Sequence, residues 1–247
     1  MFRQVLGLLV SVAALLATLA APSPVSAAGP PVLVVAGLSE SASQLQTILG
    51  RLQNDGFTAF GMQLPSTNGV PGCGDIAASS QAVANEAQQV LAQTGASQLD
   101  VIGHSEGGLA LRYYIKNLGG ASQVPIYVSL GTPQHGTNFV NSFGGSLGTC
   151  PAVAQMQPNS AFLNTLNSPT DVPGAVKYTA LATTRDELVT PAPQASFLQN
   201  GGQNAAVQTF CPNDNTDHIG LLSDAPTYLL ARSALREQPL STNCSAN

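Results

Sequence analysis

One serine of this chain lies in a pattern suited to nucleophilic attack. The stretch Val101-Ile102-Gly103-His104-Ser105-Glu106-Gly107 places Ser105 between two glycines, after an apolar run. This is the G-x-S-x-G pattern, in which a sharp turn between a strand and a helix presents the serine hydroxyl, and glycines at its flanks avoid a collision. The pattern requires a strand before the turn and a helix after it, and residues 98–102 and 107–118 are predicted to form them. Ser105 is therefore the predicted nucleophile.

A serine hydroxyl is a weak nucleophile at neutral pH and needs a base, for which the sequence offers three histidines. His218 follows the last predicted strand, where a loop can carry it back over Ser105, so we predict that it is the base. His135 lies in a loop just past a strand and is a less favoured base. His104 directly precedes Ser105 and is expected to be a packing residue.

An acid is needed to orient the base, and Asp186 is the predicted one. It follows a predicted strand (176–181) and lies between Ser105 and His218 along the chain. Glu187 is the adjacent alternative. Three other aspartates fit less well, because one precedes that strand and two crowd the histidine: Asp171, Asp214 and Asp217. Asp217 is expected instead to cap a short helix that begins with His218.

The oxyanion that forms on acyl transfer needs two preorganised donors. The backbone N–H after the nucleophile, that of Glu106, and one from the loop after the first strand, that of Leu38, are the predicted donors. Losing one such donor raises the barrier by roughly 3 kcal/mol. A carboxylate beside an oxyanion is unfavourable, so the Glu106 side chain is expected to be solvated or paired, for example by Arg112.

Hydrophobic patterns predict strands that alternate with helices. Strands are predicted at 31–36, 57–64, 98–102, 124–130, 176–181 and 205–210, and helices at 43–54, 76–94, 107–118 and 225–236. This alternation indicates an α/β fold with a mostly parallel sheet covered by helices on both faces. Two stretches rich in Gly, Pro and Asn, 65–74 and 137–154, are predicted loops. The second, with Phe139, Val140, Phe143 and Leu147, is either a small lid or acyl-pocket wall, or a plain surface loop.

The first 28 residues are typical of a secretory signal peptide. Arg3 precedes an apolar run (5–20), and Val25-Ser26-Ala27 forms a small-residue cleavage site. The run is shorter than the roughly 20 residues that span a bilayer, although an uncleaved anchor is the alternative. Residues 29–247 are then predicted to form a single, secreted domain with no transmembrane segment.

Four cysteines support export, because an even number without C-x-x-C spacing favours two disulfides. We favour Cys73 with Cys150 and Cys211 with Cys244, since each pair would tie down a loop or the tail; a zinc site is the competing use.

The chain has eight Lys and Arg against thirteen Asp and Glu, and no basic run. This charge argues against a nucleic-acid partner. No cofactor and no required metal are predicted, although Asp214 with Asp217 could imitate a calcium site.

Four segments resemble the secreted bacterial triacylglycerol lipases and esterases of the α/β-hydrolase superfamily. They are Val32-Leu33-Val34-Val35-Ala36-Gly37-Leu38, the Ser105 turn continued through Leu109-Ala110-Leu111-Arg112-Tyr113-Tyr114, Ser129-Leu130-Gly131-Thr132-Pro133-Gln134-His135-Gly136-Thr137, and Asp186-Glu187-Leu188-Val189-Thr190-Pro191. The resemblance implies an α/β-hydrolase fold and a triad of Ser105, Asp186 and His218. It also implies carboxylic esters of fatty acids as substrates. The sparse charge of the chain is compatible with transient contact to a lipid interface. The chain departs from the family at Ala36, where many relatives have histidine, and at Glu106, where many have glutamine or methionine.

The leading hypothesis is therefore an extracellular, monomeric serine hydrolase that cleaves lipid or other carboxylic esters through an acyl-enzyme. A cutinase-like polyester hydrolase, a thioesterase and an acyltransferase are alternatives, because all use this machinery. A non-catalytic ligand-binding protein on the same scaffold is an alternative of another class.

Overall fold

The structure is a computed structural model that describes residues 29–139 and 147–246, together with Met1. Its centre is a six-stranded sheet in the order β2-β1-β5-β6-β7-β8, in which every neighbouring pair is parallel. The strands are β1 (Val32–Val35), β2 (Ala59–Met62), β5 (Asp100–His104), β6 (Ile126–Leu130), β7 (Lys177–Ala182) and β8 (Gln203–Ala206). The sheet confirms the predicted α/β-hydrolase fold class.

Three neighbouring strands, β1, β5 and β6, are buried along their whole length. Continuous apolar runs such as Val32–Val35 are typical of parallel strands, because helices cover both faces of the sheet. Successive side chains point to opposite faces, so Leu33 and Val35 enter one hydrophobic core while Val32 and Val34 enter the other.

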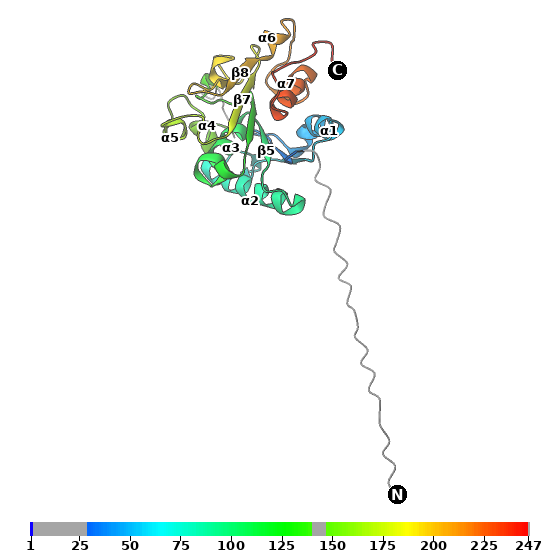
Figure 1. Ribbon diagram of the computed structural model, residues 1–247. Coiled ribbons are helices and arrows are strands. Elements are labelled where there is room, and N and C mark those ends of the chain that lie inside the picture. The colour runs from blue at the N-terminus through cyan, green and yellow to red at the C-terminus, as the bar shows by residue number, and fades with distance from the viewer. Residues whose placement is uncertain (2–28, 140–146, 247) are drawn as a thin grey trace.

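Helices cover each face of this sheet (Figure 1). On one face lie α2 (Ile76–Thr94) and α3 (Glu106–Asn117), which pack against each other, with α4 (Pro151–Gln155) and α5 (Ala161–Asn167) beside them. On the other face lie α1 (Gln46–Asn54) and α7 (Ala225–Leu235). Short 3-10 helices complete the connections at Ala42–Leu45 (η1), Gly120–Ser122 (η2), Leu147–Thr149 (η4), Gln194–Ser196 (η5) and Ile219–Leu222 (η6).

Three predictions about local structure need correction. The predicted strand 205–210 is split, since β8 ends at Ala206 and residues Val207–Phe210 form the short helix α6. The predicted loop 65–74 contains a hairpin of β3 (Ser66–Thr67) and β4 (Val70–Pro71). The predicted loop 137–154 contains η4 and most of α4, while Val140 and Phe143 lie outside the described residues.

Two disulfides join Cys73 to Cys150 and Cys211 to Cys244, which confirms the favoured pairing. The first ties the hairpin to the start of α4, and the second ties the end of α6 to the C-terminal tail. Within the described residues, no helix is long and apolar enough to cross a membrane.

The carboxyl ends of the parallel strands meet at one edge of the sheet, where ligands of open α/β folds bind. The turn Gly37–Glu40 follows β1, Ser105 follows β5, and Asp186 follows β7. His218 lies in the loop between α6 and η6. The topology thus brings segments that are far apart in the sequence to one place.

Candidate active site

Ser105 occupies a strained turn between β5 and α3. Its φ of 51° and ψ of −126° lie outside the regions that residues with a side chain normally adopt, at a cost of about 1–3 kcal/mol. The turn is held at its base, because the Ser105 N–H donates to Leu130 O at the end of β6 (2.9 Å). A Cβ atom at Gly107 would lie 2.4 Å from Val35 O, so only glycine lets α3 begin this close to β1.

His218 and Asp186 form a buried hydrogen-bonded pair. His218 Nδ1 lies 2.8 Å from Asp186 Oδ2, and both side chains are almost fully buried. Asp186 Oδ1 accepts the N–H groups of Leu188 (3.0 Å) and Val189 (2.6 Å), which fixes the carboxylate. Because a carboxylate only accepts, His218 Nδ1 carries the hydrogen of this bond and Nε2 is the nitrogen left to act as a base.

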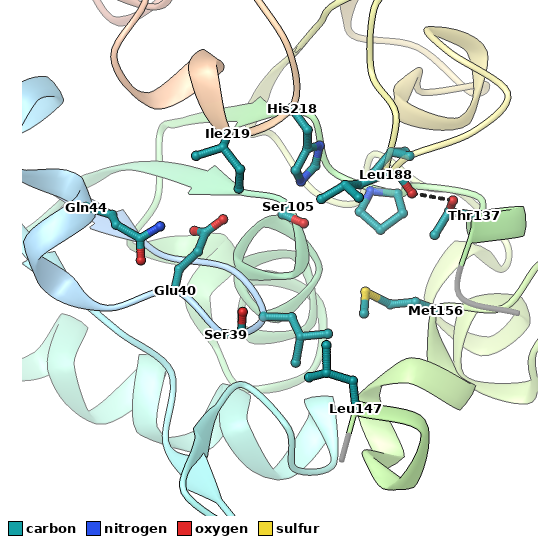
Figure 2. A pocket seen from close by; sticks show the side chains of 13 residues that line it. Ser39, Glu40, Gln44, Ser105, Thr137, Leu147, Met156, Leu188, His218 and Ile219 are labelled. Atoms are coloured by element: carbon teal, nitrogen blue, oxygen red, sulfur yellow. Dashed lines mark hydrogen bonds between the residues drawn. The ribbon is translucent and has the colours of Figure 1, made fainter. Parts of the chain in front are cut away.

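Ser105 and His218 line the same cavity, which has a volume of about 140 Å³ (Figure 2). Among the described residues, no hydrogen bond joins the Ser105 hydroxyl to His218. In many hydrolases this bond shortens only when substrate binds. Most of the cavity wall is apolar and is formed by Leu38, Pro133, Leu147, Met156, Leu188, Val189 and Ile219. Ile219 is well exposed, at 42% of its surface.

The turn after β1 lies directly against Ser105. A Cβ atom at Gly37 would be 2.7 Å from Ser105 Cβ and 3.4 Å from the Glu106 nitrogen, so a side chain there is excluded. Leu38 lines the cavity. Within the described part of the chain, neither Leu38 N–H nor Glu106 N–H has a hydrogen-bond partner. An oxyanion hole requires donors without such partners.

Two residues at this site, Glu40 and His104, make polar contacts that the sequence did not predict. His104 was expected only to pack, yet its Nδ1 lies 2.6 Å from Glu40 Oε1 and its Nε2 lies 3.0 Å from His218 O. Glu40 Oε2 accepts the Gly37 N–H at 2.6 Å. Glu40 follows no helical or strand pattern, and only the proximity of the β1 turn to β5 shows its partner.

The expectation for Glu106 is wrong. Its side chain is fully buried, and neither carboxyl oxygen has a hydrogen-bond partner among the residues that the structure describes. Arg112 instead donates to Gln134 (2.9 Å) and Asn167 (2.9 Å). A Cβ atom at Gly72 would lie 2.6 Å from Glu106 Oε2, so the carboxyl group packs against the β3–β4 hairpin. Burial, with the negative charge of Glu40, raises the pKa of Glu106 well above its ordinary value.

The remaining candidates lie outside the cavity or support its loops. His135 pairs with Asp171 at 3.1 Å, and neither lines the cavity. The Glu187 carboxylate accepts a hydrogen bond from the backbone N–H of His218 (3.3 Å). The two aspartates near the histidine bond to nearby backbone, since Asp214 accepts from Thr216 N–H (2.8 Å) and Asp217 accepts from Gly220 N–H (2.7 Å).

One group of side chains has the composition of a metal site. Glu40, His104 and His218 offer ligand atoms within 4.8 Å of one another. Both ring nitrogens of His104 and both carboxylate oxygens of Glu40 are already engaged in hydrogen bonds, as described above. A metal ion needs lone pairs on neutral imidazoles, so the donor set fits an ion pair better than a metal ligand set.

The sequence of the chain is similar to those of a thioesterase family and of several lipases. The family model of palmitoyl protein thioesterase matches residues 31–172, which is more than half of the chain. A triacylglycerol lipase of Pseudarthrobacter phenanthrenivorans is 32% identical over 117 residues, which cover 46% of this chain and 34% of that protein. Lipase B of Pseudozyma antarctica is 26% identical over 168 residues, covering 66% and 49%. This chain thus spans about a third to a half of the curated relatives that it matches.

Solved structures share the fold. Aspergillus fumigatus lipase B superposes with a TM-score of 0.71 at 22% identity, covering 86% of this chain and 54% of that one. The mature form of Bacillus licheniformis lipase BlEst2 gives 0.68 at 18% identity, with 87% and 94% covered. The resemblance to lipases and esterases of the α/β-hydrolase superfamily is thereby confirmed. The chain belongs to the palmitoyl protein thioesterase family and has the α/β-hydrolase fold.

Proposed function

We propose that this chain is a carboxylic-ester hydrolase of the lipase and esterase class, with Ser105 as nucleophile, His218 as base and Asp186 as the acid that orients His218. The observation that carries this proposal is the buried hydrogen bond between His218 and Asp186 (2.8 Å), at the edge of a cavity that Ser105 also lines. The family match covers Ser105 but ends before Asp186 and His218, so the roles of these two rest on geometry and chain order.

In the acylation step, Ser105 Oγ attacks the ester carbonyl carbon while His218 Nε2 takes the hydroxyl proton. The carbonyl oxygen becomes an oxyanion that the N–H groups of Leu38 and Glu106 hold. When the bond to the leaving oxygen breaks, His218 returns the proton to the departing alcohol and an acyl-enzyme remains.

In the deacylation step, water attacks the acyl carbon and gives a proton to His218 Nε2. The same two N–H groups hold the second oxyanion, and the proton then passes to Ser105 Oγ as the fatty acid leaves. Asp186 keeps the Nδ1–H tautomer throughout, which leaves Nε2 ready for each transfer.

The apolar wall of the cavity supports an acyl chain as the group that is bound there. Thioesters are a second candidate substrate class, favoured by the match to the palmitoyl protein thioesterase family. A thioester places the same carbonyl against the same donors and differs in its leaving atom, which is sulfur. Polyester hydrolysis is an alternative that uses the same machinery, and acyl transfer to another acceptor is an outcome of the test below.

We also infer that the chain is exported and that residues 1–28 are removed. The sequence pattern of those residues and the two disulfides support this inference, because disulfides persist in oxidising compartments. Residues 29–247 are then one catalytic domain.

Hydrolysis of p-nitrophenyl esters with short to long acyl chains, beside thioesters of the same chains, tests the function. We expect activity in the parent protein and a loss of about 10⁴-fold or more in Ser105→Ala, which removes the attacking oxygen. The control variant Ser43→Ala removes a serine hydroxyl from η1, and it should keep the activity of the parent protein.

The outcomes separate the alternatives. Preference for thioesters over esters of equal chain length would make the chain a thioesterase, and release of acyl groups only to an added alcohol would make it an acyltransferase. Ligand binding without hydrolysis in both the parent and Ser105→Ala would contradict the proposal in favour of a binding protein.

A further inference from the structure

A second buried pair of carboxylate and imidazole lies behind the proposed triad. Glu40 belongs to the turn after β1, and His104 is the last residue of β5. Their side chains are 3% and 0% exposed, and Glu40 Oε1 lies 2.6 Å from His104 Nδ1. Figure 2 shows Glu40 beside Ser105, at the side of the cavity that the β1 turn forms. Glu40 is therefore part of the wall of the cavity, and His104 lies behind it.

The partners of His104 define its charge. Nδ1 faces the Glu40 carboxylate, and Nε2 lies 3.0 Å from the backbone oxygen of His218. A carboxylate and a carbonyl oxygen only accept hydrogen bonds, so both ring nitrogens must donate. A neutral imidazole has one N–H, so this arrangement requires the doubly protonated imidazolium.

The charges around the pair agree with this assignment. Burial alone would lower the pKa of His104, but the charge and hydrogen bond of Glu40, the His218 carbonyl and the charge of Asp186 together raise it. Burial alone would raise the pKa of Glu40, but the charge and hydrogen bond of His104 and the Gly37 N–H together lower it. Glu106 faces Glu40 from α3, and burial together with the charge of Glu40 raises the pKa of Glu106.

The pair connects three parts of the proposed machinery. Glu40 Oε2 accepts the Gly37 N–H (2.6 Å) and Glu40 N–H donates to Gly37 O (3.3 Å), which closes the turn that presents Leu38. His104 directly precedes Ser105 in the chain. Through Nε2 it also holds the backbone of His218, 114 residues further along.

We propose that Glu40 and His104 form a permanent buried ion pair that positions the Leu38 turn and the His218 loop against Ser105. Both are positioning residues, since neither needs to touch the reacting atoms. The proposal rests on the proposed function for its effect on catalysis, but the ion pair itself exists or fails independently of any ester.

The charge of His104 is measured by nitrogen-15 NMR of the histidine rings. The chain has three histidines, His104, His135 and His218, so substitution of each assigns the signals. We expect one ring with both nitrogens protonated throughout the neutral range, and we expect its signals to vanish in His104→Gln. In Glu40→Gln the same ring should become neutral, because the amide donates to Nδ1 instead of accepting from it. A neutral His104 in the parent protein would overturn the proposal.

The positioning role is measured by the kinetics of Glu40→Ala and Glu40→Gln, with the rate counted per titrated serine. We expect Glu40→Ala to lower kcat by about tenfold to a hundredfold with little change in KM, since misplacing reacting groups by about 1 Å costs about a hundredfold. Glu40→Gln should recover part of the rate, because its oxygen still accepts the Gly37 N–H. Glu86→Gln on α2 is the charge-matched control.

The two measurements distinguish the possible failures. A parent protein without any esterase or thioesterase activity would contradict the proposed function, while the NMR result would still decide the ion pair. Unchanged kcat in a folded Glu40→Ala would contradict the positioning role. If Glu40→Ala does not fold, Glu40→Gln decides: a charge-neutral His104 with full kcat would show that the ion pair is not needed for positioning.

Discussion

At the scale of single residues, the proposed nucleophile and base lie at one cavity, and Glu106, the residue after the nucleophile, has a buried carboxyl group without a hydrogen-bond partner among the described residues. Ser105 and His218 are recognisable because a glycine pattern and chain order mark them, and the structure places both at one cavity. The environment of Glu106 was not predictable, because its contacts come from the β3–β4 hairpin and not from its own helix. Arg112 is six residues further along α3, a spacing that turns its side chain to a different side of the helix.

Glu106 leads to a prediction about stability and pH. The pKa of Glu106 is raised in the folded chain, whereas in the unfolded chain it is about 4.3. Between these two values the folded state binds more protons than the unfolded state, so the free energy of unfolding falls as pH rises through this range. Above the folded pKa the loss is complete and constant. Glu106→Gln removes the ionisable group, so its stability relative to the parent protein should increase from acidic to neutral pH.

Unfolding in urea at a series of pH values measures this difference. The groups that face Glu106 supply no positive charge that would stabilise its ionised form. Glu40 is an acid, and residues 66–72 of the hairpin carry no titratable side chain. Glu86→Gln removes a carboxyl group whose side chain is only partly buried, and it should follow the parent curve. A constant difference between Glu106→Gln and the parent protein at all pH values would show that Glu106 is not held neutral.

At the scale of helices and strands, strong patterns predicted most of the elements. Helix α2 has the predicted bounds, 76–94, because its buried face is mostly apolar and Gly95, with φ of 69°, ends it. The strand at 205–210 failed because a short apolar run does not distinguish a strand from one turn of helix. Only pairing with β7 decides where β8 ends, and that pairing stops at Ala206.

The close packing of α3 on β1 leads to a prediction about glycine. In Gly107→Ala the new methyl group would meet Val35 O at 2.4 Å and Ala36 O at 2.6 Å, and backbone atoms cannot move aside cheaply. Overpacking of this kind costs about 1–3 kcal/mol, so the variant should unfold at lower urea concentration and lose activity. Gly50→Ala in α1 is the matched control. Among the described residues, no atom beyond the backbone of α1 and the two neighbours of Gly50 lies within 4 Å of the new methyl group, so this variant should be more stable than the parent protein by about 0.5–1 kcal/mol.

Equal stability of the two alanine variants would contradict the packing argument, because both add one methyl group to a helix. A destabilised Gly107→Ala with full activity per folded molecule would show instead that the turn at Ser105 tolerates a shift of α3.

At the scale of the whole molecule, two disulfides close loops of very different length around a sparsely charged domain. Cys73 and Cys150 are 77 residues apart, and Cys211 and Cys244 are 33 residues apart. Closing loops of these lengths in the unfolded chain is worth about 3 to 5 kcal/mol each, slightly more for the longer one. The spacing of cysteines does not define such pairs. The pairing was predictable here because each loop-borne cysteine had a plausible role at the site or at the tail.

Export and the two disulfides are tested together on protein collected from the culture medium. We expect it to begin near residue 29 and to contain no free thiol. Replacing Cys73 and Cys150 by serine should lower both thermal stability and activity, because that bond anchors the hairpin that packs on Glu106 next to the Leu38 turn. Replacing Cys211 and Cys244 should lower stability while leaving kcat per folded molecule closer to that of the parent protein, because that bond holds the tail against α6. Protein that retains residues 1–28 would contradict cleavage, and equal effects of the two replacements on kcat would contradict the link between the hairpin and the site.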